Sequence, residues 1–132
     1  MTKGPEGRRC CIGRLDAAFV ERVEAFSDRA LDVAEELQRQ RRFARIIDQL
    51  VGSGTSVGAN VCEADEALSR KDFAKSIGIA IKELNETRYW FRRIARREWI
   101  AVRRLTALQK EAAELKLILG AILTRTRRND SA

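Results

Sequence analysis

Apolar residues recur along most of the chain in alternating steps of three and four. The first run begins at Leu15 and continues with Phe19, Val23, Phe26, Ala30, Val33 and Leu37. This spacing places the apolar side chains on one face of a helix of about six turns. Ser27 and Asp28 lie in the middle of the run and could instead cap a second helix. The unbroken spacing favours one continuous helix, with at most a kink at these two residues.

A second run extends from near Arg41 and includes a segment of small residues, 52–60. Its apolar positions are Phe43, Ile46, Ile47, Leu50, Gly54, Val57, Val61 and Ala64. Each glycine costs a helix about 1 kcal/mol relative to alanine, so a loop is a second interpretation of segment 52–60. Because the apolar spacing continues across the segment, we predict a helix that crosses close to a neighbouring helix at its small residues. The glycines lack the GxxxxGKS/T spacing of a phosphate loop.

Two further runs complete the pattern. Ser69 can cap a third helix, and Asp72 suits the positive end of that helix dipole. The apolar face of this helix comprises Phe73, Ile77, Ala80, Leu84, Thr87, Phe91 and Ile94. The fourth run starts near Ile100 and forms an almost pure heptad seam. The seam consists of Leu105, Leu108, Ala112, Leu115, Leu119 and Ile122.

Four amphipathic segments with short connections predict an all-α protein with an up-down-up-down four-helix bundle over residues 15–128. Residues 1–14 contain the only proline and show no periodicity, so we predict a flexible N-terminal tail there and a frayed C-terminus over 129–132. Several apolar residues lie off the core stripes and indicate contact with another subunit. These residues are Ile79, Ile81, Leu117 and Ile118.

The composition agrees with long helices and argues against other classes of protein. One proline and 6% aromatic residues do not suit an all-β sandwich or barrel with its frequent turns. The longest stretch without a charge, Gln49–Cys62, is shorter than the roughly 20 apolar residues that a membrane-spanning helix needs. The N-terminus lacks the apolar region of a secretory signal, so we expect a cytoplasmic protein.

Residue types that commonly carry catalysis are scarce. The chain has no histidine, so the commonest general base and the commonest transition-metal ligand are both missing. The three cysteines are Cys10, Cys11 and Cys62, and they show no CxxC spacing. We therefore expect no metal, no disulfide and no cofactor, with Cys62 as a small core residue. The chain is predicted not to be an enzyme.

The net charge of +7 is unevenly distributed. From Arg88 to Arg128 there are twelve Lys and Arg residues against three acids. Arginine forks suit phosphate oxygens, so the end of the third helix and the start of the fourth form the candidate nucleic-acid-binding surface. Its residues are Arg92, Arg93, Arg96, Arg97, Arg103 and Arg104. A solvated basic face without a ligand and a surface for an acidic protein partner are the alternatives.

Polar residues share faces of the second and third helices. Glu63 and Glu83 could form an acid–base pair or hold a divalent metal. We favour a structural polar network that fixes the register of the helices, because an unsatisfied buried partner costs about 1–3 kcal/mol. The network residues are Ser56, Asn60, Glu63, Glu83, Thr87 and Arg88. Trp90 lies beside arginines and is predicted to occupy the core or an interface, with base stacking as the alternative.

The stretch from Gln49 to Ile94 resembles the bacterial four-helix-bundle proteins encoded in intervening sequences of 23S ribosomal RNA genes. The matching positions are Ser53, Thr55, Ser56, Gly58, Ala59, Asn60, Glu63, Ala64, Asp72, Phe73, Glu83, Glu86, Thr87, Arg88, Tyr89 and Trp90. The same superfamily includes the accessory variability protein of diversity-generating retroelements. Many members have arginine where this chain has Gly52, so any contact of that arginine is absent here.

The resemblance implies a bundle that assembles into a ring-shaped homo-oligomer, a homopentamer in the characterised relatives, without an established catalytic activity. The retroelement relative is similar to a nucleic-acid-binding partner of a reverse transcriptase. We therefore expect a non-enzymatic oligomer that binds RNA or DNA backbone through its arginine-rich surface with little sequence specificity. The alternative is an assembly or accessory module that binds an acidic protein partner.

Overall fold

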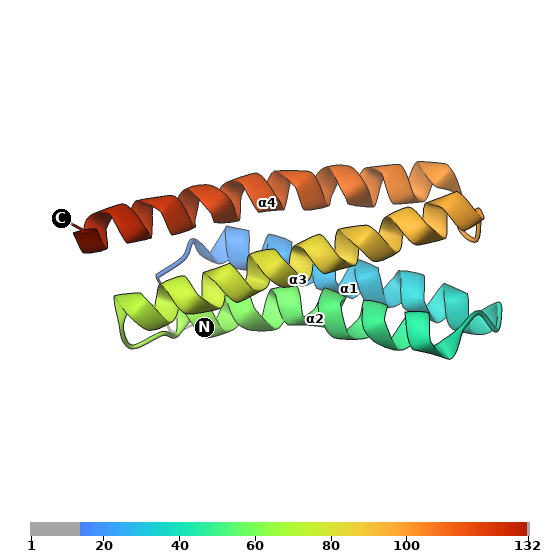
Figure 1. Cartoon of the computed structure of the whole chain (residues 1–132), viewed down its shortest axis with the longest axis horizontal. Helices are drawn as coiled ribbons and strands as arrows, with labels where there is room; N and C mark the ends of the chain where they lie inside the picture. Colours follow the sequence, from blue (N-terminus) through green and yellow to red (C-terminus); the bar gives the residue numbers. More distant parts are fainter. Residues whose placement is uncertain (1–13, 132) are drawn as a thin grey trace, which may run out of the picture.

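The computed structural model describes residues 14–131, which form four helices and no strand (Figure 1). The helices are α1 (Ala17–Arg39), α2 (Ala44–Asp65), α3 (Arg70–Arg97) and α4 (Val102–Ser131). Successive helices run in opposite directions, so this part of the chain has the predicted all-α, four-helix architecture. None of these helices is both long and apolar enough to cross a membrane.

The structure describes less of the N-terminal end of the chain than of the C-terminal end. Residues 1–13 and Ala132 lie outside the described residues, and with them Cys10, Cys11 and nearly all of the predicted tail at 1–14. At the other end, α4 continues through Ser131, past Arg128, where the sequence places the end of the bundle.

α1 and α2 cross at small residues, as the sequence predicts. Both helices are continuous, α1 through Ser27 and α2 through the whole of segment 52–60. A Cβ added to Gly54 would lie only 2.7 Å from the Cβ of Ala30. The hydroxyl of Ser27 donates to the carbonyl oxygen of Gly54 (2.7 Å) and accepts from the N–H of Gly58 (3.0 Å). The glycines of α2 therefore permit close approach of two backbones.

The heptad positions of all four helices meet in one core. Phe26 of α1 and Phe91 of α3 make an edge-to-face contact with ring centroids 6.2 Å apart. The hydroxyl oxygens of Ser53 and Thr87 lie 2.9 Å apart and form a buried polar pair between α2 and α3. The aliphatic centre of the core includes Leu37, Leu50, Ile77, Leu84, Leu105, Leu115 and Leu119.

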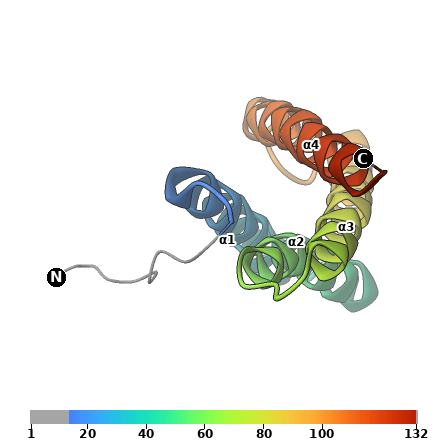
Figure 2. The same cartoon turned by 90° about the vertical axis from the view of Figure 1, so that its left-hand side faces the viewer.

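Seen along the bundle, the helices follow one another around an arc (Figure 2). α2 packs extensively against both α1 and α3, whereas α1 and α4 make few contacts. Arg22 of α1 spans this weaker boundary, and its guanidinium donates to Glu111 (2.7 and 2.8 Å) and to Glu114 (2.7 Å). The bonds with Glu111 raise the pKa of Arg22 above its usual range and lower the pKa of the Glu111 carboxyl.

The α1–α2 and α3–α4 loops lie at the same end of the bundle (Figure 1). α1 and α3 each stop at a residue in the left-handed region, Arg41 (φ 57°) and Glu98 (φ 59°). The N–H of Arg42 then reaches back to the carbonyl oxygen of Leu37 (3.0 Å), which is the usual way to end a helix with such a residue. Glycine normally occupies this position, so the sequence carries no clear stop signal for α1.

Phe43 does not belong to the core stripe that the sequence predicts for the second helix. α2 begins at Ala44, and Phe43 precedes it with φ −59° and ψ 119°. Phe43 is 63% exposed, and it is not among the residues that form the core or pack against it. The fourth helix likewise begins at Val102, after the expected start near Ile100.

Candidate nucleic-acid interface

The six arginines that the sequence selects lie together around the end of α3 and the start of α4. All of them are exposed except Arg93, which is half-buried. Within α3, four of them point outward around the half of the helix that faces away from the core residues Phe91 and Ile94. Five of the six predicted arginines therefore face solvent around the α3–α4 loop, and the Nε of Arg93 is buried.

The α1–α2 loop and its flanks add four arginines that lie outside the basic second half of the sequence. Because both loops lie at one end of the bundle, residues 39–45 and 92–104 share that end (Figure 1). These two stretches contain ten arginines and one acid, Glu98. The four additional residues are Arg39, Arg41, Arg42 and Arg45. We call these two stretches together the arginine-rich end.

Trp99 joins the two loops. Its indole ring is only 8% exposed and lies 4.8 Å from the guanidinium carbon of Arg42 and 5.8 Å from that of Arg97. Its backbone carbonyl oxygen accepts a hydrogen bond from the side-chain amide of Gln40 (2.9 Å). Two arginines from distant parts of the sequence thus flank one buried ring, and the arginine-rich end is a single surface.

Carboxylates neutralise very little of this charge. Arg39 pairs with Glu36 at 2.7 Å, and the other nine arginines form no ion pair with a carboxylate of residues 14–129. Hydrogen bonds from Gln40 and Arg39, and the nearby charge of Arg104, lower the pKa of the Glu36 carboxyl. The arginine-rich end therefore keeps a strong positive field, which attracts polyanions.

Three aromatic side chains besides Trp99 lie near these arginines, namely Tyr89, Trp90 and Phe43. Tyr89 is stacked edge-to-face on Trp90 (centroids 5.0 Å apart), with Arg92 and Arg93 at 5.8 and 5.2 Å from its centroid. Trp90 itself is half-buried and donates from its indole N–H to Glu86 (3.2 Å). Phe43 is the more exposed of the aromatic groups, and its ring centroid lies 5.9 Å from that of Trp99.

The residues of the predicted polar network are not gathered at one place. Thr87 makes the interhelical contact, and its partner is Ser53. The amide of Asn60 donates to the carbonyl oxygen of Ser56 (2.9 Å) within α2, and Glu63 is exposed. The Nε–H of Arg88 is buried and has no hydrogen-bond partner among the described residues. Helical spacing placed these side chains on common faces, but only Thr87 is at the depth where α2 and α3 touch.

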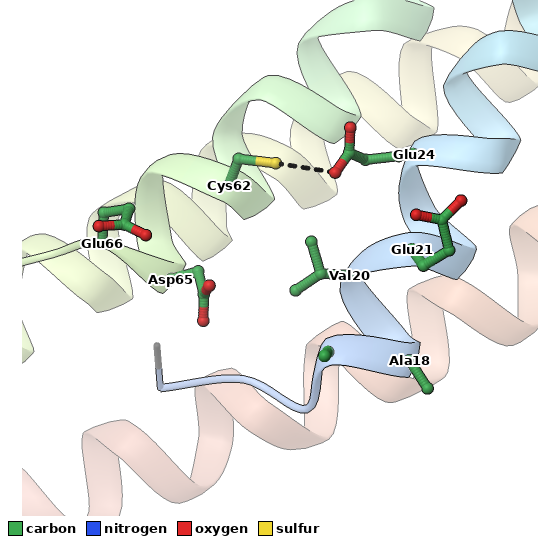
Figure 3. A pocket seen from close by; sticks show the side chains of 8 residues that line it. Ala18, Val20, Glu21, Glu24, Cys62, Asp65 and Glu66 are labelled. Atoms are coloured by element: carbon green, nitrogen blue, oxygen red, sulfur yellow. Dashed lines mark hydrogen bonds between the residues drawn. The ribbon is translucent and has the colours of Figure 1, made fainter. Parts of the chain in front are cut away.

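The opposite end of α1 carries a pocket with acidic walls (Figure 3). Glu21, Glu24, Asp65 and Glu66 line it, and its lining includes no Lys or Arg from the part of the chain that the structure describes. Cys62 lies at its edge, with its sulfur 3.6 Å from a carboxylate oxygen of Glu24. Within residues 14–131 no three Cys, Asp or Glu side chains gather closely enough to hold a metal ion. The walls of this pocket are acidic, although Arg14, Arg70 and Arg125 line a second pocket near the same end of the bundle.

Comparisons with known proteins identify a family and a crystal structure that are similar to this chain. A family model described as 23S rRNA-intervening sequence protein matches residues 16–121. A crystal structure of a protein with unknown function from the S23 ribosomal protein family of Bacteroides thetaiotaomicron is 33% identical in sequence, with a TM-score of 0.75. The match covers 80% of this chain and 97% of that chain. No curated protein matches the sequence.

Proposed function

The chain belongs to the family of 23S rRNA-intervening sequence proteins, and we propose that it is a non-enzymatic protein that binds the backbone of RNA or DNA at its arginine-rich end. The observation that carries this proposal is the lack of internal neutralisation. Nine arginines at this end have no carboxylate partner among the described residues, so their charge is available to a ligand. Planar guanidinium groups suit the oxygens of a phosphodiester backbone, which is present in every sequence.

The proposal requires binding that depends strongly on salt. Each phosphate that meets an arginine releases condensed counterions, and about six such contacts would lower affinity by about a thousandfold between 50 and 200 mM salt. A filter-binding titration of RNA and of DNA at these two concentrations measures the effect. Saturable binding that ignores ionic strength would contradict a backbone mechanism.

Charge reversal within α3 and α4 tests where the ligand binds. We expect the combined changes Arg92→Glu, Arg96→Glu and Arg103→Glu to abolish binding of RNA and DNA at 50 mM salt, because they turn a positive surface partly negative. A matched control carries Lys71→Glu, Lys75→Glu and Lys82→Glu, which change the net charge equally with exposed residues nearer the start of α3.

The two triple variants separate a local surface from total charge. Retained binding in the lysine variant, with loss in the arginine variant, supports the arginine-rich end. Equal loss in both would mean that affinity follows net charge alone. Undiminished binding by the arginine variant would place the ligand elsewhere, and failure of the unaltered protein to bind either nucleic acid would favour an acidic protein partner.

We also propose that the bundle assembles into a ring-shaped homo-oligomer, as its resemblance to pentameric relatives implies. Leu117 on the outer side of α4 is 75% exposed, and Ile79, Ile81 and Ile118 are only half-buried, which supports contact with another subunit. In a ring the arginine-rich end would be repeated, so weak contacts would act together. Light scattering that returns the mass of a single chain would contradict this assembly.

A further inference from the structure

We propose that Phe43 is a stacking platform for an unpaired base, so that single-stranded nucleic acid is the preferred ligand of the arginine-rich end. This inference rests on the proposed function and adds the class of nucleic acid. It starts from an exposed aromatic ring that lies beside Trp99 in a loop rich in arginine.

Phe43 is placed where a ligand can reach it. Its side chain is 63% exposed, although phenylalanine is usually buried. The Trp99 ring is its one aromatic neighbour among the described residues, and the two planes are inclined by 50°. Tyr89 is less exposed, at 41%, and Arg92, Arg93 and Trp90 all contact its ring.

The ring of Phe43 is positioned by the loop around it. The turn before it is closed by backbone hydrogen bonds from Arg41 to Gln38 (3.0 Å) and from Arg42 to Leu37 (3.0 Å). Trp99, on which Phe43 rests, is almost fully buried. Because the backbone of the turn is already ordered, less freedom is lost when a base stacks on the ring.

Cations lie on both sides of Phe43 in the sequence. Arg41, Arg42 and Arg45 are all exposed, and no acid occurs between Glu36 and Asp48. A base that stacks on the ring would have its flanking phosphates among these guanidinium groups. Aromatic residues within a basic surface are the usual arrangement for binding single strands without reading their sequence.

A duplex cannot use this platform in the same way. Bases inside a duplex are stacked on one another, and only an end or an unpaired nucleotide exposes a free face. Phosphate contacts alone would serve duplexes and single strands alike. The stacking platform is therefore the feature that would discriminate between them.

The test compares four probes of equal length by fluorescence anisotropy: single-stranded RNA, single-stranded DNA, the RNA duplex and an abasic strand. We expect Phe43→Ala to weaken binding of both single strands about tenfold, because one stacked base is lost. The affinity of the Phe43→Ala variant for the duplex and for the abasic strand should stay within about twofold of the affinity of the unaltered protein, since these probes rely on phosphate contacts. Phe43→Trp should retain the preference for single strands.

A matched control is Leu68→Ala, which removes another exposed apolar side chain, 95% exposed, from the α2–α3 loop at the other end of the bundle. It should change none of the four affinities. Circular dichroism would establish that each variant is folded, as expected for substitutions at exposed positions.

The possible outcomes separate this inference from the proposed function. If the unaltered protein binds all four probes equally and Phe43→Ala has no effect, the platform is wrong and the arginine surface stands. If the variant loses duplex and single strand equally, Phe43 has no stacking role. A change in oligomeric mass with unchanged affinities would show that a second copy covers the ring. Absence of any binding by the unaltered protein overturns both proposals.

Discussion

Gly52 and Gly54 are separated by one residue on α2 but face different surroundings. A side chain at Gly52 would meet nothing within 4 Å, whereas a Cβ at Gly54 would collide with the buried Cβ of Ala30 on α1. Ala30 cannot relieve this contact by changing its rotamer, because its side chain ends at the Cβ. The two positions therefore separate the helix-weakening effect of glycine from its use in close packing.

We expect Gly54→Ala to lower the free energy of unfolding by about 1–3 kcal/mol, since α1 and α2 must move apart. Gly52→Ala should raise it by up to about 1 kcal/mol, because alanine is the better helix former and finds open space. Urea titrations followed by circular dichroism measure both changes. If Gly54→Ala stabilised the protein as Gly52→Ala does, close packing at this crossing would be wrong.

At the scale of elements, the boundary between α1 and α4 depends on a polar bridge. These helices make few other contacts, so the hydrogen bonds between Arg22 and Glu111 contribute to holding the arc together. The folded state lowers the pKa of Glu111, so its charged form is favoured by folding. The resulting stability is fully present above the pKa of an unfolded glutamate, about 4.3, and is lost as the pH falls through the lower folded value.

We expect Glu111→Gln to reduce the free energy of unfolding by about 0.5–1 kcal/mol at pH 7, as for a partly exposed ion pair. The difference from the unaltered protein should shrink as the pH falls below the pKa of an unfolded glutamate, about 4.3, and through the lower pKa of Glu111 in the folded protein. Urea titrations between pH 3 and 7 test this dependence. Glu63→Gln, the same change at an exposed residue of α2, is the control and should show no such convergence.

The four helices were predictable because each buries one face, and apolar residues therefore recur every three or four positions in the sequence. Their ends were less predictable. Arg41 and Glu98 take the left-handed conformation without being glycine, and Phe43 precedes α2 without a side-chain cap. Periodicity continued through these positions, so Phe43 was wrongly assigned to the core. Its exposure follows from backbone angles that no pattern of apolar residues reveals.

Only the part of the candidate site that lies in one segment of the sequence, residues 92–104, was predictable. Arg92 to Arg104 stand out as a local excess of charge in the second half of the chain. Arg41 and Arg42 lie in a first half whose total charge is nearly balanced, so a count by segment overlooks them. In an up-down-up-down bundle the first and third loops share one end, and counting charge by end would have included these residues.

At the scale of the whole molecule, the arginine-rich end and the acidic pocket lie at opposite ends of the bundle, and the end with the pocket also carries Arg14, Arg70 and Arg125. The arginine-rich end occupies the α1–α2 and α3–α4 loops, and the acidic pocket lies near the start of α1 and the end of α2 (Figures 1 and 3). Glu24 and Arg39 are 15 residues apart on α1, which corresponds to about 22 Å at about 1.5 Å per residue. This separation exceeds the Debye length of about 8 Å at 0.15 M ionic strength but not that of about 30 Å at 0.01 M.

Neutralising the acidic pocket therefore distinguishes a local binding surface from attraction by the whole protein. The combined changes Glu21→Gln, Glu24→Gln and Glu66→Gln make the net charge more positive by three without touching an arginine. We expect affinity for single-stranded RNA to stay within about twofold at 0.15 M and to rise several-fold at 0.01 M, where screening no longer separates the two ends. Anisotropy titrations at both ionic strengths measure this. A large gain at 0.15 M would mean that the bound strand passes close to the pocket, and the arginine-rich end would then be only part of the interface.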